Sequence, residues 1–128
     1  MSRNNNSSKL TFNRVQVIGH LGKTPELKYT GEGRAWVRTS IAVYQGEDKP
    51  TMWLQVKAFA KADGTGWDDS VPVALAECAK GARVQLTGKL VYEEREHNGT
   101  TYRDWGIVLY QAPVDAPRDS STRDEEPD

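Results

Sequence analysis

Two segments of this chain alternate at period two between apolar residues and residues that are mostly aromatic, basic or polar. Successive side chains of a β-strand point to opposite sides of a sheet, so this period separates two faces and predicts two strands. In segment 51–61 the apolar row is Met52, Leu54, Val56 and Ala58, and the opposite row is Trp53, Gln55, Lys57, Phe59 and Lys61. In segment 35–44 the apolar row is Ala35, Val37, Thr39, Ile41 and Val43, and the opposite row is Trp36, Arg38, Ser40, Ala42 and Tyr44.

The rows opposite the apolar ones admit two interpretations. Rings that stand beside cations suit unpaired nucleic acid, because bases stack on flat rings and cations attract phosphates. The same rows also suit a solvated sheet face stabilised by cross-strand aromatic pairs. The two strands alone leave both interpretations open.

Length and composition indicate one domain in a reducing compartment. The 128 residues, 37% of them hydrophobic, suffice for one modest core. No apolar run approaches the ~20 residues that span a bilayer, and the polar start does not resemble a signal peptide. The single cysteine, Cys78, excludes a disulfide framework within the chain. Only His20 and His97 could join Cys78 as metal ligands, and neither shows the spacing of a metal site. We therefore expect Cys78 to be a small buried hydrophobic residue, and we expect no metal site.

Charge is distributed unevenly along the chain. The net charge is −1, but residues 115–128 contain six acids and two arginines, which leaves 15 basic and 12 acidic residues in 1–114. The body is therefore mildly basic and the tail acidic. The positive charge of the body is weaker than that expected of a protein that recognises duplex DNA. It is compatible with single-strand binding in which base stacking supplies much of the binding energy.

The order of predicted elements indicates an all-β fold. Strands are expected at about 12–21, 35–44, 51–61, 83–91 and 101–110, with a short helix after Ser70 whose apolar stripe is Val71, Ala74, Leu75 and Cys78. This order predicts a five-stranded OB-fold barrel with one short helix between strands 3 and 4, in which strands 2 and 3 form the ligand face. Residues 62–70, with Trp67, are expected to form an exposed loop. We expect residues 1–9 to be disordered, residues 10–112 to be the domain, and residues 113–128 to be a disordered acidic tail.

Several motifs, in order and at similar spacing across about residues 12–111, resemble the bacterial single-stranded DNA-binding protein family. They are the segment NRVQVIGHLGKTPELKYT from Asn13 to Thr30, then Trp53-x-x-Val-x-x-Phe59-x-Lys61, and then Lys80-Gly81-x-x-Val84-x-x-x-Gly88-x-Leu90. The resemblance implies base stacking by Trp53 and Phe59 and basic contacts by Lys61 and Lys80. It also implies an oligomer of barrels around which single strands wrap, most often a homotetramer, with a dimer as the alternative.

The chain departs from the family pattern in several places, of which three bear on the site. The segment after Leu90, basic and aromatic in the family, reads Val-Tyr-Glu-Glu-Arg-Glu here, and like charge makes it an unfavourable DNA contact. The link from Ala60 to the helix is longer than usual, so the family gives no guide to Trp67. The tail ends Glu-Glu-Pro-Asp without the terminal aromatic residue that docks family members onto replication and repair enzymes. An acidic tail could still compete with DNA for the basic face.

The leading hypothesis is a cytoplasmic, nucleoid-associated protein, or a phage protein in its host's cytoplasm, that binds single-stranded DNA without strong sequence preference. It would protect unpaired strands in replication, recombination or repair, need no cofactor, and also bind RNA. The predicted stacking residues are Trp53, Phe59, Trp36 and Tyr44, and the predicted phosphate contacts are Arg38, Lys57, Lys61, Lys80 and Lys89. The alternative is an OB-fold interaction module, a replication-restart or recombination accessory whose main ligand is a protein. No nucleophile–base pair or phosphate loop supports an enzyme.

Overall fold

The computed structural model describes residues 11–116, which are mostly β-sheet. The long strands are β1 (Val15–Leu21), β3 (Ala35–Val43), β4 (Met52–Phe59), β7 (Arg83–His97) and β8 (Thr100–Leu109). The short elements are β2 (Glu26–Tyr29), β5 (Lys61–Ala62), β6 (Trp67–Asp68), the helix α2 (Ser70–Ala76) and β9 (Val114–Asp115). The expected disordered start and most of the expected tail lie outside the described residues.

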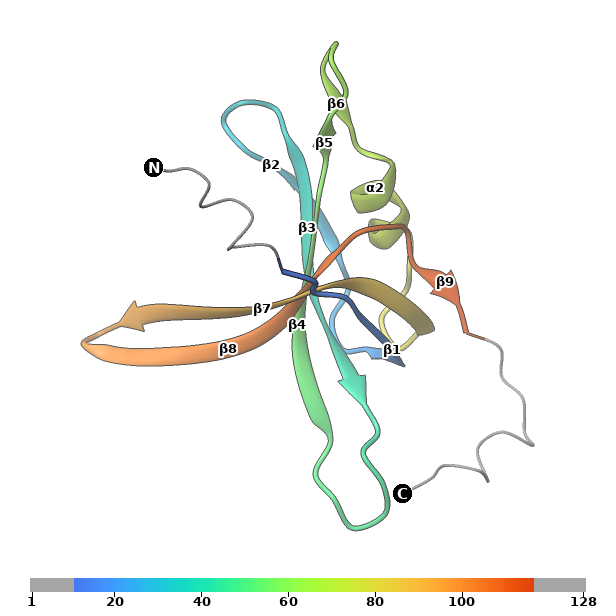
Figure 1. Cartoon of the computed structure of the whole chain (residues 1–128), viewed down its shortest axis with the longest axis vertical. Coiled ribbons are helices and arrows are strands. Elements are labelled where there is room, and N and C mark those ends of the chain that lie inside the picture. The colour runs from blue at the N-terminus through green and yellow to red at the C-terminus, as the bar shows by residue number, and fades with distance from the viewer. Residues whose placement is uncertain (1–10, 117–128) are drawn as a thin grey trace.

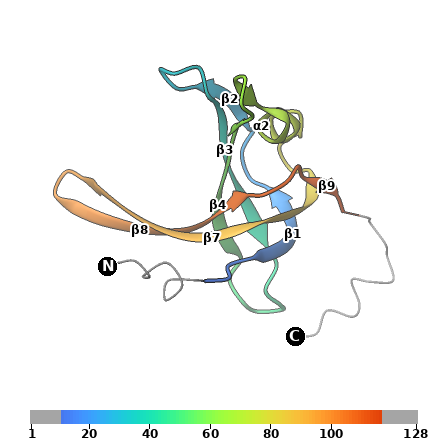
Figure 2. The same ribbon diagram turned by 45° about the horizontal axis from the view of Figure 1, so that its top comes forward.

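The five long strands form a closed ring by their pairings. Figures 1 and 2 show the strands crossing at the centre of the molecule. Each pairs with two neighbours in the order β1, β3, β4, β8, β7 and back to β1. Every pairing in the ring is antiparallel except that of β4 with β8, which is parallel over Gln55–Lys57 and Gly106–Val108. The predicted all-β OB fold, with one short helix between the third and fourth long strands, is confirmed.

The apolar rows of the strands face the inside of this ring, as period two predicts. Val37, Ile41, Val56 and Ile107 are 0–1% exposed and belong to one core cluster. Apolar burial at about 25 cal/mol per Å² is the main stabilising contribution of such a core. The inward set of β3 and β4 therefore fixes, by alternation, which residues of these strands point outward.

The helix α2 covers one end of the ring next to β3 and β4 (Figure 1). Leu75 is fully buried in the core cluster, and Val71 and Cys78 pack against it half-buried, so the predicted apolar stripe contacts the core. The carboxylate of Asp68 accepts a hydrogen bond from the Ser70 backbone N–H (3.1 Å), while Asp69 at the N-cap makes no side-chain cap bond. Within residues 11–116 no helix has the length and apolar character that crossing a bilayer requires.

Strands β7 and β8 continue beyond the ring as a two-stranded hairpin, residues 92–105, which we call the arm. The arm points away from the body in Figures 1 and 2. Their pairing runs to His97 opposite Thr100, and Asn98 and Gly99 form the turn with positive φ angles of 54° and 81°. Two successive residues of this kind produce the tight turn whose twist matches a hairpin. The strand expected to end at Val91 therefore extends six residues further. Its outer part lacked an apolar row from which to predict it.

Two further short pairings differ from the expectations. Most of the segment 62–70, expected to form a loop, belongs to a short hairpin. In this hairpin Lys61 pairs with Asp68 and Ala62 pairs with Trp67. After Pro113, where we expected no fold, β9 pairs with β7, and Ala116 is 9% exposed, with its N–H donating to the Arg83 carbonyl (3.3 Å). Backbone pairing with β7 thus continues past Pro113.

Candidate nucleic-acid interface

The outward rows of β3 and β4 lie side by side, because the two strands pair antiparallel over their whole length. Trp36 lies opposite Phe59, Arg38 opposite Lys57, and Ala42 opposite Trp53. We call this surface the outer face; it consists of the outward residues of β3 and β4. Five of the predicted site residues, Trp36, Arg38, Trp53, Lys57 and Phe59, are therefore together on one side of the sheet.

At one end of the outer face, two of these rings stack. The Trp36 and Phe59 ring centroids are 5.9 Å apart and the ring planes differ by 10°. Such an aromatic pair contributes about 0.5–1.5 kcal/mol beyond its burial. Both rings are half-buried, so they keep surface that a ligand can reach.

Two cations that the sequence analysis did not single out lie against these rings. The Lys28 ammonium lies 5.7 Å from the Trp36 centroid, and the Arg34 guanidinium carbon lies 5.0 Å from the Phe59 centroid. Lys28 reaches Trp36 because β2 pairs with β3 and places the two residues opposite each other. Neither cation belongs to the two alternating segments, so only the pairing of β2 with β3 could have revealed Lys28.

Trp53 lies at the other end of the outer face. It is six residues from Phe59 along β4, a separation of about 20 Å at the usual rise per residue. Its side chain is 58% exposed, and its ring lies across Gly22, where an added Cβ would clash with ring atom Cζ3. Tyr44 is 64% exposed and directly follows β3. Trp53 and Tyr44 thus lie apart from the stacked pair of Trp36 and Phe59.

The predicted cations fall into one row and two separate positions. Arg38 pairs with Lys57, Lys57 with Val108, and Val108 with Lys89, so the three cations lie in one line across the sheet. Lys61 donates to the Tyr110 carbonyl (3.1 Å). Lys80 is exposed in the turn between α2 and β7 and does not belong to the row.

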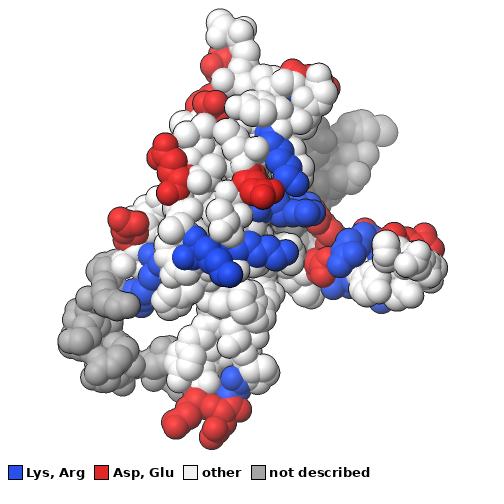
Figure 3. Space-filling view, turned by 180° about the vertical axis from the view of Figure 1, so that it is seen from behind, with Lys and Arg blue, Asp and Glu red and all other residues white. Residues whose placement is uncertain are grey.

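Basic side chains also gather across the middle of the molecule when it is seen from behind, next to the base of the arm (Figure 3). A depression beside the row is lined by residues of the β1–β2 connection, β2 and β3: Lys23, Thr24, Glu26, Arg38 and Thr39. Lys23 and Arg38 therefore border the same hollow. Glu26 lies opposite Arg38 on β2, and its charge partly offsets theirs.

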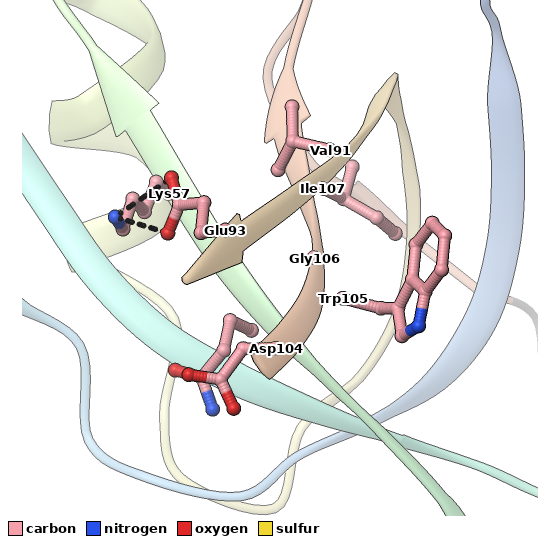
Figure 4. Close-up of a pocket in the computed structure, with 8 residues that line it drawn as sticks. Lys57, Val91, Glu93, Asp104, Trp105, Gly106 and Ile107 are labelled. Atoms are coloured by element: carbon pink, nitrogen blue, oxygen red, sulfur yellow. Dashed lines mark hydrogen bonds and ion pairs between the residues drawn. The ribbon is translucent and has the colours of Figure 1, made fainter. Parts of the chain in front are cut away.

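One cation of the row is already paired with an acid of the arm. The Lys57 ammonium lies 3.0 and 3.2 Å from the two carboxylate oxygens of Glu93, and Figure 4 shows this pair at the junction of β4 and the arm. Glu93 lies opposite Asp104 on β8, whose carboxylate is 3.1 Å from Arg95. The arm thus brings negative charge to the edge of the basic row. A phosphate that bound Lys57 would have to compete with Glu93.

The aromatic residues of the arm differ in position from those of the outer face. Trp105 is 54% exposed and contacts Tyr92, with ring centroids 4.6 Å apart. Trp105 pairs with Tyr92 next to the Leu90–Ile107 pair, and Ile107 faces the core. By alternation, these two rings continue the inward row rather than the row of Lys57 and Lys89.

Neither the cysteine nor the acids of the described residues form a metal centre. Burial raises the pKa of the Cys78 thiol, and its sulfur donates to the Ala74 carbonyl (3.5 Å), consistent with a packing role. Between residues 11 and 116 no group of three or more His, Cys, Asp or Glu side chains is arranged to hold a metal ion.

The chain is similar in sequence to bacterial proteins with one shared name. It is 33% identical over 93 residues to the single-stranded DNA-binding protein of Thermus thermophilus, a match that covers 70% of this chain and 32% of that relative. It is 27% identical over 88 residues to single-stranded DNA-binding protein B of Bacillus subtilis, which covers 66% of this chain and 75% of the relative. The chain thus spans about a third of the length of the Thermus relative.

Solved structures share the fold. The single-stranded DNA-binding protein of Thermus aquaticus has a TM-score of 0.61 and 25% identity, over 84% of this chain and 42% of that one. The Plasmodium falciparum SSB, solved in complex with single-stranded DNA, has a TM-score of 0.66 over 85% of this chain and 98% of that one. Its 18% identity establishes likeness of fold alone. The sequence model of the single-strand binding protein family matches residues 12–110, and this chain therefore belongs to that family.

Proposed function

We propose that this protein binds single-stranded DNA without strong sequence preference on the outer face, by stacking bases on rings and neutralising phosphates with cations. The observation that carries the proposal is the exposure of Trp53, with Trp36 and Phe59 half-buried, on the same sheet surface as Arg38 and Lys57. A solvated sheet has little need of a 58% exposed tryptophan. Base stacking contributes about 1–3 kcal/mol per base, and every base has a face that can stack.

Selectivity for single strands follows from the same geometry. Duplex DNA hides its base faces within the stack and forfeits the aromatic contribution, whereas an unpaired strand can offer them to Trp36, Phe59 and Trp53 in turn. The cations add a term that weakens with salt, because bound counterions are released from the phosphates. The relatives named for single-stranded DNA binding support this ligand.

The cellular role that we propose is protection of unpaired strands during replication, recombination or repair, in the cytoplasm and as a homotetramer. Membership of the family supports this role, which involves binding and no catalysis. Stacking by Tyr44 and phosphate contacts by Lys61, Lys80 and Lys89 belong to the same proposal. Each of these four residues is exposed.

The test is a binding titration of the full chain with labelled oligo-dT and with a matched duplex at two salt concentrations. Replacing Trp53 and Phe59 with alanine should weaken oligo-dT binding by at least 30-fold, since two stacking contributions of about 1–3 kcal/mol are lost. The wild type should bind the duplex far more weakly. Unchanged affinity of the double variant would reject the stacking mechanism.

The second candidate is a module whose main ligand is a protein. The exposed pair formed by Tyr92 and Trp105 on the projecting arm favours it, because exposed aromatic residues are enriched at protein interfaces. In the same titration this candidate predicts no measurable oligo-dT binding by the wild type.

A further inference from the structure

The hairpin β5–β6 carries an aromatic side chain that the proposed interface does not yet include. Trp67 lies in β6 opposite Ala62, and its side chain is 37% exposed. The hairpin directly follows Ala60, so it continues the strand that carries Phe59. The molecule therefore places a fourth ring just beyond one end of the outer face.

Arg34 connects this ring to the stacked pair. Its guanidinium carbon is 5.0 Å from the Phe59 centroid and 5.2 Å from the Trp67 centroid, so one planar cation contacts both rings. Its Nε donates to the Ala60 carbonyl at 2.7 Å, which fixes the guanidinium group where the hairpin begins. Together with the Trp36–Phe59 stack, these contacts form an unbroken series of planar groups from β3 to the hairpin, which we call the ring series: Trp36, Phe59, Arg34 and Trp67.

We propose that Trp67 is a further base-stacking residue, which extends the single-strand interface from Phe59 across Arg34 onto the β5–β6 hairpin, with Arg34 as the positioning residue. The inference deepens the proposed function and depends on it. Base stacking suits this position because the ring is held beside two other planar groups yet keeps more than a third of its surface open. A tryptophan that served only to anchor the hairpin would gain more from full burial.

The charges of the hairpin indicate what kind of contact it can make. Asp63 accepts hydrogen bonds from the backbone N–H (3.0 Å) and hydroxyl (3.1 Å) of Thr65, and Asp68 accepts one from the Ser70 N–H. These bonds lower the pKa of both carboxyl groups, so both are ionised at neutral pH. Two carboxylates make the hairpin a poor phosphate site. The contribution of Trp67 must then come from its ring, and it should not depend on salt.

The experiment compares the full-length wild type with Trp67→Ala, Trp67→Phe and Trp105→Ala, using fluorescence anisotropy of labelled oligo-dT over a range of salt concentrations. Trp105 is the matched control, because it is an exposed tryptophan outside the ring series. W67A should weaken binding by about 5- to 100-fold, equivalent to ~1–3 kcal/mol. The slope of log K against log salt should stay that of the wild type, since no cation is removed. W67F should retain most of the affinity, and W105A should bind like the wild type.

A second oligonucleotide separates stacking from a loss of hairpin structure. On an abasic oligomer of equal length, W67A and wild type should bind equally, because no base is present to stack. Equal oligo-dT affinities of W67A and wild type would overturn the inference and leave the proposed function standing. A W67A loss of the same size on the abasic oligomer would also overturn it, since the ring would then act through structure. Failure of the wild type itself to bind oligo-dT would instead reject the proposed function.

Discussion

At the scale of single residues, the position of Trp53 depends on the absence of a side chain at Gly22. The indole lies across Gly22, and a Cβ there would meet the ring and would also come within 2.7 Å of the Ser40 hydroxyl oxygen. Ser40 is 5% exposed in spite of its outward position on β3. Gly22, Ser40 and the indole thus pack together, which holds a 58% exposed ring in one place on the outer face.

The variant Gly22→Ala tests whether that placement matters for binding. The added methyl group must displace the Trp53 ring, so oligo-dT affinity should fall by about 5-fold or more, up to the full value of one stacked base. The thermal midpoint should fall only modestly, because the exposed ring can move away and the added methyl group otherwise displaces only the buried Ser40 hydroxyl. Gly31→Ala is the matched control, since a Cβ there meets nothing within 4 Å. Equal affinities for the two variants would contradict the role given to the indole position.

At the scale of elements, the arm formed by β7 and β8 places an acid against a cation of the outer face. Its acids and bases largely pair with each other, as Glu94 does with Arg103 (3.2 Å). Glu93 is different, because its partner Lys57 belongs to β4. In the free protein, the Glu93 carboxylate therefore neutralises the charge of Lys57, which a bound phosphate would otherwise neutralise.

Glu93→Gln should therefore strengthen binding to oligo-dT. A partly exposed ion pair is worth about 0–1 kcal/mol, so the gain should be at most about 5-fold. The salt slope should steepen by about 0.7, because one more cation becomes available to a single strand. Glu96→Gln controls for removing an acid from the arm, since Glu96 forms no ion pair with any residue between 11 and 116. An equal effect of both substitutions would assign the gain to general charge and not to Lys57.

At the scale of the whole molecule, the ring of strands is supported from outside by β9. Its pairing with β7 and the burial of Ala116 lie past the point where the composition turns polar. The first and the last strand of the described chain, β1 and β9, both pair with β7. Strand β7 therefore joins two segments that are far apart in the sequence.

Shortening the chain measures what β9 contributes. A chain that ends at Pro113 loses the β9–β7 pairing, at about 0.5–1.5 kcal/mol per hydrogen bond, whereas a chain that ends at Ala116 keeps it. The shorter chain should melt about 5–10 °C lower, by the scaling for domains of roughly this size. Equal melting temperatures in calorimetry would show that β9 adds nothing to the stability of the ring.

Much of the fold and part of the interface could be predicted from the sequence, because period-two alternation specifies both the strand and the face of each residue. It assigned Trp36, Arg38, Trp53, Lys57 and Phe59 to one surface, where β3 and β4 place them. The β5–β6 hairpin escaped prediction because strands of two residues have no period to detect.

What remained hidden depends on contacts between segments. The approach of Lys28 to Trp36 depends on the β2–β3 register, and that of Arg34 to Trp67 depends on the hairpin. The Lys57–Glu93 pair joins residues 36 positions apart, from strands that are not adjacent along the chain. No local pattern encodes these three contacts.

The parallel pairing of β4 with β8 has a mechanical consequence. One continuous strand, β8, forms half of the arm and also pairs with β4 at Gln55–Lys57. These residues lie in the middle of the segment from Trp53 to Phe59. The contact at Gly106 is so close that a Cβ would come within 2.8 Å of the Gln55 carbonyl oxygen. The arm is therefore joined, through one continuous strand, to the middle of the segment that carries the rings. We expect a force on the arm to act on β4 at Gln55–Lys57, because β8 pairs with β4 there.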